Sequence, residues 1–166
     1  SHSSGPPVGG LDNSDGMLER CRENLSTRGV LDRVRLVQAD MAAFSLPERF
    51  GLIVCPFGSF TKLLDSEAQI ACLRCAGGHL KGDGRFVVDL FTPSAALMAE
   101  PDGVTHVDYR DRALPDGGRL SRSKRIYKDP VAQVNRIELE YELHRGGAVE
   151  RFVLNDALRY VYYNEM

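Results

Sequence analysis

The sequence predicts an α/β fold in which part of a parallel sheet is followed by an appended antiparallel sheet. Two observations indicate this fold class. Between Val8 and Phe91, short apolar strands alternate with helical patterns, as in a sheet covered by helices. From Val104 onward, long segments alternate polar and apolar residues, as in a sheet with one face toward water. At 166 residues the chain is long enough for one domain with its own core.

Four strands are predicted in the first half, each from an apolar run that ends at a polar or turn residue. They are Val8–Asp12, Val34–Ala39, Phe50–Cys55 and Gly84–Phe91. Ser14 is the expected N-cap of a helix that Gly29 ends, and a second helix begins at Asp65 or Ser66 and runs toward Leu80. The continuous apolar run of the third strand is typical of burial on both faces, which favours a parallel sheet.

The second half is predicted to be antiparallel. At the end of the first half, a turn at Lys81–Gly84 is expected to lead into the fourth strand. A short helix is then expected to begin at Thr92–Ser94. Four alternating segments follow, joined by glycine- and proline-containing turns: Val104–Asp111, Arg119–Asp129, Val134–Arg145 and Val149 to about Tyr160. We expect residues 8–166 to form a single domain, with an α/β part at 8–100 and a sheet insertion at 104–163.

Composition narrows the possible partners and location. A formal net charge of -2 gives no reason to expect a nucleic-acid or membrane-surface partner. No apolar run approaches the roughly 20 residues of a membrane span. Four unevenly spaced cysteines without a secretory signal favour a reducing, cytoplasmic location. Ser1–Gly5 looks like the remnant of an expression tag, so residues 1–7 are treated as a leader outside the fold.

Two aspartates follow successive predicted strands. In an open parallel sheet, ligands sit beyond the carboxyl ends of the strands. The Asp12 carboxylate is placed to accept hydrogen bonds from the hydroxyls of a ribose, or else it is a helix-entry or turn aspartate. Asp40 is placed to accept a hydrogen bond from an exocyclic adenine amine while Met41 packs on the ring, or else it is a helix N-cap. Their matching positions favour the ligand.

Four segments then carry a resemblance to a known family by their order and spacing. They are Gly10–Leu18, Gln38–Met41, Phe50–Phe60 and His79–Phe86. Together they resemble the ribose, adenine, fourth-strand and fifth-strand segments of class I S-adenosylmethionine-dependent methyltransferases of the small-molecule type. The antiparallel extension also looks like a substrate-side insertion found in some small-molecule members.

The resemblance implies S-adenosylmethionine as methyl donor, a small-molecule acceptor, and in-line methyl transfer that needs no metal. The cofactor-binding residues that it implies are Asp12, Asn13, Met17, Asp40, Met41, Pro56 and Phe57. Aromatic faces attract a sulfonium cation, so Phe57 and Phe60 are candidate pocket walls, although Phe60 is expected in the core. Asp89 points either toward the acceptor or into a turn hydrogen bond. No catalytic residue is assigned.

The chain departs from the family in three respects. Gly58 stands where such loops often carry asparagine, and Gly82 where the turn often has proline. The family's first strand and glycine-rich loop, expected before Asp12, and its closing strands are not in this sequence. We therefore expect a truncated protein with weak donor binding and no measurable turnover. The absent first strand would leave a slot between its two would-be neighbours in the sheet. The exposed sheet edges should therefore lead to a homo-oligomer such as a homodimer, or the two strands that flank this slot should pair directly.

Other interpretations stay open at this point. A nicotinamide-dependent oxidoreductase would also use Asp12, and a non-catalytic binding or assembly module derived from a methyltransferase needs no glycine loop. Cys72, Cys75 and His79 share a helical face but lack a fourth ligand, so packing is favoured over zinc or a redox pair. The last candidates, for a general base, are His106, Asp108 and Tyr109.

Overall fold

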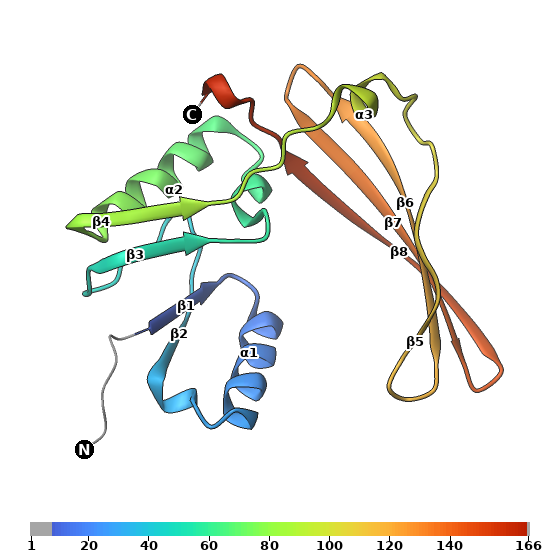
Figure 1. The fold of residues 1–166 in the computed structure, drawn as a ribbon, viewed down its shortest axis with the longest axis horizontal. Helices are drawn as coiled ribbons and strands as arrows, with labels where there is room; N and C mark the ends of the chain where they lie inside the picture. Colours follow the sequence, from blue (N-terminus) through green and yellow to red (C-terminus); the bar gives the residue numbers. More distant parts are fainter. Residues whose placement is uncertain (1–7, 166) are drawn as a thin grey trace. The chain divides into compact units, whose positions relative to one another are not determined.

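The computed structural model describes residues 8–165, apart from the side chain of Tyr163. The chain divides into two compact units, which are described separately (Figure 1). The first unit contains the chain up to Ile53 together with Glu67–Phe86, and the second contains Val54–Ser66 and the chain from Val87 onward. The leader predicted at residues 1–7 lies outside the described residues.

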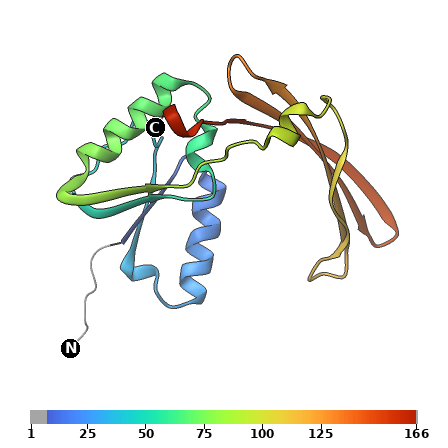
Figure 2. The same ribbon diagram turned by 45° about the horizontal axis from the view of Figure 1, so that its top comes forward.

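The first unit begins with a parallel strand pair and one helix. Strands β1 (Val8–Asp12) and β2 (Val34–Gln38) pair in parallel, and helix α1 (Asp15–Thr27) lies beside them in Figures 1 and 2. The Ser14 side chain accepts a hydrogen bond from the backbone of Met17, which confirms the predicted N-cap. Leu18 is the buried residue of α1, so the helix is anchored by an apolar side chain in its first turn.

A second strand pair is formed by β3 (Phe50–Cys55) and β4 (Leu80–Val88), with α2 (Ser66–Gly78) between them in the sequence. The predicted turn at Lys81–Gly84 is wrong, because these residues lie within β4. A Cβ atom on Gly84 would stand 2.9 Å from the backbone oxygen of Phe50. The glycine therefore serves the close approach of neighbouring backbones instead of a turn.

The exposure of β3 contradicts the prediction that its apolar run is buried on both faces. Leu52 and Val54 are 56% and 51% exposed, whereas Ile53 and Cys55 between and after them are half-buried. Only one face of the strand is covered, and a continuous apolar run cannot reveal that difference. The predicted direct pairing of the strands that flank the slot, β1 and β3, is also wrong. Strand β1 pairs with β2 and β3 with β4, in separate sheets.

The second unit carries the predicted antiparallel sheet. Its four strands lie in the order β5-β6-β7-β8, with β5 at His106–Ala113, β6 at Arg119–Asp129, β7 at Val134–Arg145 and β8 at Ala148–Arg159. The short helix α3 (Ala95–Ala99) is capped by Ser94, whose hydroxyl accepts from Leu97. Short 3-10 helices lie in connections of the chain, at Leu31–Arg33, Ser59–Lys62 and Tyr163–Glu165.

The β7–β8 hairpin shows the predicted alternation most clearly. The register pairs Leu139 with Leu154 and Tyr141 with Phe152 on one face, while Glu140 falls on the other. Arg145 pairs with Ala148, so a two-residue turn joins the strands, and Gly146 and Gly147 have φ angles of 56° and 81°. Positive φ at both central positions is what a type I′ hairpin turn requires.

The buried core residues of the second unit lie near the start of β7 and the end of β8. Phe60 and Tyr160 are 0% exposed, and Val134 and Val161 are also buried. The apolar sheet face itself is less covered, because Phe152 and Leu154 remain 38% and 50% exposed. Across residues 8–165, no helix has the length and apolar character needed to cross a membrane.

Candidate functional site

Asp12 is the last residue of β1 and is half-buried. Its Oδ1 accepts a 2.8 Å hydrogen bond from the backbone of Ser14, and its carbonyl accepts one from Ala39 at 3.1 Å. Within the described part of the chain, no hydrogen bond or ion pair engages the second carboxylate oxygen. The turn interpretation is therefore confirmed, and it leaves one oxygen for a further donor.

Asp40 repeats this arrangement just after β2. Its Oδ1 accepts a 2.8 Å hydrogen bond from the backbone of Ala42, and its carbonyl accepts one from Ala43 at 3.0 Å. A turn follows, not a helix, so the N-cap alternative for Asp40 is wrong. The carboxylate holds its own local turn by one oxygen while the side chain stays exposed, and Met41 beside it is half-buried.

Parallel pairing brings these residues to one edge of the first unit. Asp12 lies opposite Gln38, whose side-chain amide donates to the carbonyl of Asn13 at 3.4 Å. Met17, 60% exposed, lies in the first turn of α1, which starts at the same edge. Since the carboxyl ends of parallel strands meet at one edge, the predicted site residues of this unit, Asp40 included, share one end of the β1–β2 pair.

In the second unit, Asp89 follows β4 and holds the loop that follows β3. Its Oδ2 accepts from the backbone of Phe57 at 2.8 Å, and its Oδ1 accepts from Gly58 at 2.6 Å. Both loop residues have positive φ angles, 59° for Phe57 and 67° for Gly58. The turn interpretation of Asp89 is confirmed, over a separation of about thirty residues that sequence spacing did not reveal.

The same loop separates its two aromatic residues completely. Phe57 is 95% exposed, whereas Phe60 is 0% exposed and belongs to the core, as predicted. The Ser59 hydroxyl donates to the carbonyl of Pro56 at 2.8 Å, which closes the loop around an exposed proline. The structure thus places Pro56 and Phe57 on the surface of the second unit, at the end of β3.

Cys55 ends β3 beside this loop. Burial raises the pKa of its thiol, a hydrogen bond with the backbone of Phe60 opposes that rise, and the charge of Asp89 adds to it. A raised pKa keeps the group as a thiol, which is a much weaker nucleophile than a thiolate. Cys55 is therefore unsuited to take a methyl group itself.

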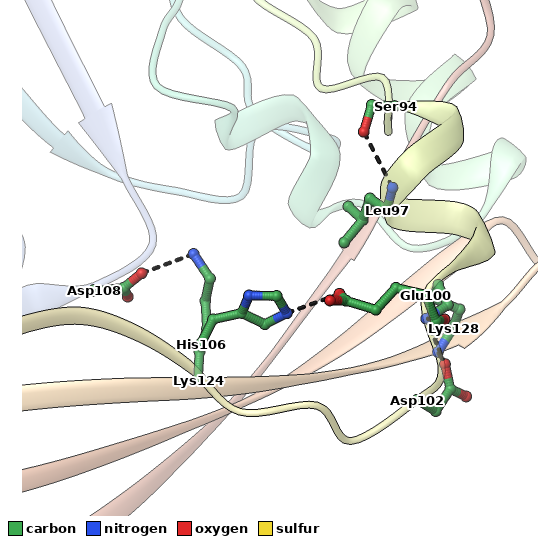
Figure 3. A network of polar contacts seen from close by, with 8 residues as sticks. All are labelled: Ser94, Leu97, Glu100, Asp102, His106, Asp108, Lys124 and Lys128. Atoms are coloured by element: carbon green, nitrogen blue, oxygen red, sulfur yellow. Dashed lines mark hydrogen bonds and ion pairs between the residues drawn. The ribbon is translucent and has the colours of Figure 1, made fainter.

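A polar network lies where β5 begins, and Figure 3 shows its members. His106 Nε2 lies 2.8 Å from Glu100 Oε2, and because a carboxylate only accepts, Nε2 carries the proton. Such a contact leaves the lone pair on the neutral ring's Nδ1. This His–Glu pair was not foreseen, because Glu100 lies in another predicted element.

The other two candidates for a general base, Asp108 and Tyr109, each have a cationic side chain beside them. Burial disfavours the charge of Asp108, but Lys124 and Arg122, each 2.8 Å away, outweigh it and lower its pKa below the usual value. A carboxylate with a lowered pKa is a poor proton acceptor. The Arg122 guanidinium also lies 5.2 Å from the centre of the Tyr109 ring, which orders that side chain.

The possible metal ligands Cys75, within α2, and His79, just after it, have other partners. His79 Nδ1 lies 2.7 Å from the carbonyl of Cys75, and its Nε2 accepts from the backbone of Leu46 at 2.9 Å. Both ring nitrogens are therefore engaged in holding a loop. Within residues 8–165, no group of three or more histidine, cysteine or acidic side chains is arranged to hold a metal ion.

Comparisons with known proteins agree with this geometry. Residues 3–84 match a family model described as a methyltransferase domain. A search of curated proteins by sequence finds no significant match.

Solved structures resemble nearly the whole chain. An S-adenosylmethionine-dependent methyltransferase from Clostridium acetobutylicum has a TM-score of 0.78 and 17% identity, over 96% of this chain and 60% of that chain. The CcbJ methyltransferase from Streptomyces caelestis has a TM-score of 0.77 and 24% identity, over 95% of this chain and 59% of that chain. CalS10 is an amino pentose methyltransferase from Micromonospora echinaspora solved with S-adenosylmethionine. It has a TM-score of 0.74 and 23% identity, over 96% of this chain and 62% of that chain. The chain spans about three-fifths of the length of these proteins. Residues 3–84 thus resemble a methyltransferase domain, and the fold of the chain is that of the S-adenosylmethionine-dependent methyltransferases.

Proposed function

We propose that this protein binds S-adenosylmethionine and takes part in methyl transfer to a small molecule. The observation that carries the proposal is the pair Asp12 and Asp40 at one sheet edge, each with one oxygen tied into its own turn. Among the similar structures, CalS10 is described as an amino pentose methyltransferase and KedS8 as a sugar N-methyltransferase. A sugar-bearing acceptor is therefore the class to test first.

The first unit would hold the adenosine half of the donor. The outward oxygen of Asp12 suits the ribose hydroxyls, because a carboxylate accepts strong, charge-assisted hydrogen bonds. Asp40 would accept from the adenine amine, with Met41 against the ring. Asn13 and Met17 line the same edge and would border the ribose.

Pro56 and Phe57, both exposed after β3, remain candidate donor contacts by resemblance to the family. The bound donor supplies an electrophilic methyl group on a positively charged sulfur. The protein's contribution is to align the acceptor's nucleophilic atom with that group, since positioning alone can supply much of the rate enhancement. The acceptor's lone pair forms the new bond to carbon, and the carbon–sulfur bond breaks to leave a neutral thioether.

An acceptor that carries a proton on its nucleophilic atom needs a base. We propose His106 for this role, because Glu100 holds its Nε2 hydrogen and leaves Nδ1 to accept a proton. Asp108 is less suited, since its pKa is lowered by its cationic neighbours after a partial offset by burial.

Calorimetric titration with S-adenosylmethionine tests the proposed function. The Asp12→Ala variant should bind more weakly by about 1.5 to 3 kcal/mol, the range for hydrogen bonds to a charged group. Asp32→Ala is the matched control, because this exposed aspartate lies in the 3-10 helix before β2, at the strand's opposite end. Equal affinities for wild type and Asp12→Ala would remove Asp12 from the site, and no binding by wild type at about 1 mM donor would refute the proposed function.

We also propose a homo-oligomer and a reducing, cytoplasmic setting. Strand β8 is an edge of its sheet, and Val149, Val153 and Leu154 on it are about half exposed. A second copy would pair its own β8 edge there. Light scattering should show a smaller mass for Val153→Lys and no change for Val107→Lys on the opposite edge strand. None of the four cysteines forms a disulfide within residues 8–165, as a reducing compartment allows.

A further inference from the structure

The segment that follows Asp40 contains neither helix nor strand before β3 begins at Phe50. Its side chains nevertheless alternate, because Ala42, Phe44 and Leu46 are half-buried whereas the residues between them are exposed. A connecting segment without ladder hydrogen bonds keeps one conformation only where other elements hold it. The direction of the Asp40 carboxylate therefore depends on what holds these three positions.

His79, just after α2, holds two of the three positions. Its Nε2 accepts a hydrogen bond from the backbone of Leu46 at 2.9 Å, and its ring centre lies 4.6 Å from that of Phe44. Its Nδ1 lies 2.7 Å from the carbonyl of Cys75, and since a carbonyl only accepts, Nδ1 carries the proton. The ring is thus fixed in one tautomer, with its donor toward the helix and its acceptor toward the segment.

The third position is held through Cys75, which lies in α2. Its thiol donates to the carbonyl of Ala42 at 3.3 Å, while the amide of Ala42 donates to Oδ1 of Asp40 at 2.8 Å. A single residue of the segment therefore connects the helix to the aspartate, and all of these groups belong to the first unit. A shift of the segment at the end of α2 would change the direction of the other oxygen of Asp40.

We propose that His79 is a positioning residue, which together with Cys75 orients the Asp40 carboxylate toward the adenine amine of the donor. This inference rests on the proposed function, and it gives the end of α2 a part in base specificity. An exocyclic amine offers an N–H donor to a carboxylate, whereas an oxygen in its place is an acceptor that the carboxylate repels. A carboxylate held in one direction discriminates between the two bases, and one that can turn away discriminates less.

Calorimetry on the whole chain compares S-adenosylhomocysteine with S-inosylhomocysteine, in which an oxygen replaces the exocyclic amine. Wild type should bind the amine ligand more tightly, and Asp40→Ala should abolish most of that preference. His79→Phe keeps a ring beside Phe44 but removes both nitrogens, so it should reduce the ratio of the two affinities by about three- to tenfold, the range for one neutral hydrogen bond. His79→Gln offers an oxygen acceptor to the amide of Leu46 and should keep the ratio within about twofold of wild type.

Two controls on α2 separate positioning from a general loss of structure. Arg74→Gln changes an exposed residue next to Cys75 in the sequence and should leave both affinities unchanged. Cys72→Ala truncates a side chain that is 3% exposed, so it should lower the stability and leave the ratio of affinities at the wild-type value. A ratio that falls equally in Cys72→Ala and His79→Phe would overturn the positioning role, because His79 would then act through stability alone.

Amide hydrogen exchange supplies a readout that needs no ligand. The amide of Leu46 should exchange faster in His79→Phe than in wild type, and that of Ala42 should exchange faster in Cys75→Ala. Cys75→Ala removes only the thiol and should also reduce the ratio of the two affinities. If His79→Phe does not fold, Cys75→Ala decides the question, and an unchanged ratio in that variant would overturn the inference.

The results also separate this inference from the proposed function. If wild type prefers the amine ligand and Asp40→Ala loses that preference while His79→Phe retains it, this inference alone fails. If wild type binds neither ligand, the proposed function fails and this inference fails with it.

Discussion

At the β1–β2 edge, Asp12 and Asp40 each accept a hydrogen bond from a backbone amide two residues later. After β4, Asp89 instead accepts two hydrogen bonds, from amides 32 and 31 residues earlier in the chain. All three aspartates lie at or just after the carboxyl end of a strand in the α/β part. Asp12 and Asp40 each use one carboxylate oxygen to accept a hydrogen bond within a local turn, whereas Asp89 uses both oxygens to accept hydrogen bonds from a distant loop.

This difference teaches how one residue type can serve two purposes at similar strand ends. A carboxylate with one oxygen in its own turn is oriented at little entropic cost, and its other oxygen can meet a ligand. A carboxylate with both oxygens engaged organises the chain and presents another residue. The following predictions test that contrast, from the largest expected effect to the smallest.

The loop held by Asp89 rests on the core, and removing that support should give the largest effect. Phe60→Ala should lower the free energy of unfolding by about 3 to 5 kcal/mol, because it leaves a cavity at a fully buried site. Urea denaturation measures the change. Phe57→Ala serves as the control and should not destabilise the protein, since its ring is 95% exposed. A loss below about 1 kcal/mol for Phe60→Ala would show that the loop does not depend on the core.

Asp89→Asn should lower the free energy of unfolding by about 1 kcal/mol, near the net value of one hydrogen bond. The side-chain amide retains one acceptor and turns a donor toward the other backbone amide. Thermal denaturation at neutral pH measures the loss against wild type. An unchanged midpoint would mean that water replaces the carboxylate without penalty, and the contrast with Asp12 would then disappear.

Asp12→Asn should change stability by less than about 0.5 kcal/mol, because asparagine offers the same acceptor to the turn. The same variant should still bind S-adenosylmethionine more weakly than wild type, since it lacks the charge that strengthens hydrogen bonds to the ribose. Paired denaturation and calorimetry separate the two effects. A variant that loses stability but keeps its affinity would place Asp12 with Asp89 as a purely structural carboxylate.

Asp108 should give the smallest effect, visible only in acid. Despite the opposing effect of burial, Lys124 and Arg122 lower its pKa, so the folded state favours the ionised carboxylate more than the unfolded state does. Its contribution to stability is complete above the unfolded pKa of about 3.9 and is lost as the pH falls through the lower folded pKa. The stability difference between wild type and Asp108→Asn should therefore shrink below about pH 4. A stability difference that grows in acid would contradict the assignment.

The strand and helix positions were predictable because their signals are local. Ser14 caps α1 as its position before an amphipathic run implies, and the segment Arg119–Asp129 was read with the bounds that the structure has. The turn at Lys81–Gly84 was misread because Gly84 permits close backbone contact as readily as a turn. One residue type with two uses cannot be assigned from its neighbours in sequence.

The candidate site was also predictable only where its signals are local. Asp12 and Asp40 could be placed at a common edge because parallel strands bring their carboxyl ends together. The partners of Asp89 and His106 could not, since the contacts join residues from different elements and depend on the angle at which those elements meet. Sequence therefore predicts which strand ends carry polar groups, and tertiary structure decides what each group holds.

The β7–β8 hairpin has a consequence for how the chain folds. Its register runs unbroken from Arg145 opposite Ala148 to Val134 opposite Arg159, so every pairing can follow from the turn at Gly146–Gly147 without closing a long loop. Hairpins of this kind form within microseconds, whereas the parallel β1–β2 pair must first bring together residues separated by a whole helix. The β7–β8 hairpin is thus able to form before the β1–β2 pair, and a one-residue insertion at its glycine turn would send each side chain of β8 to the opposite face.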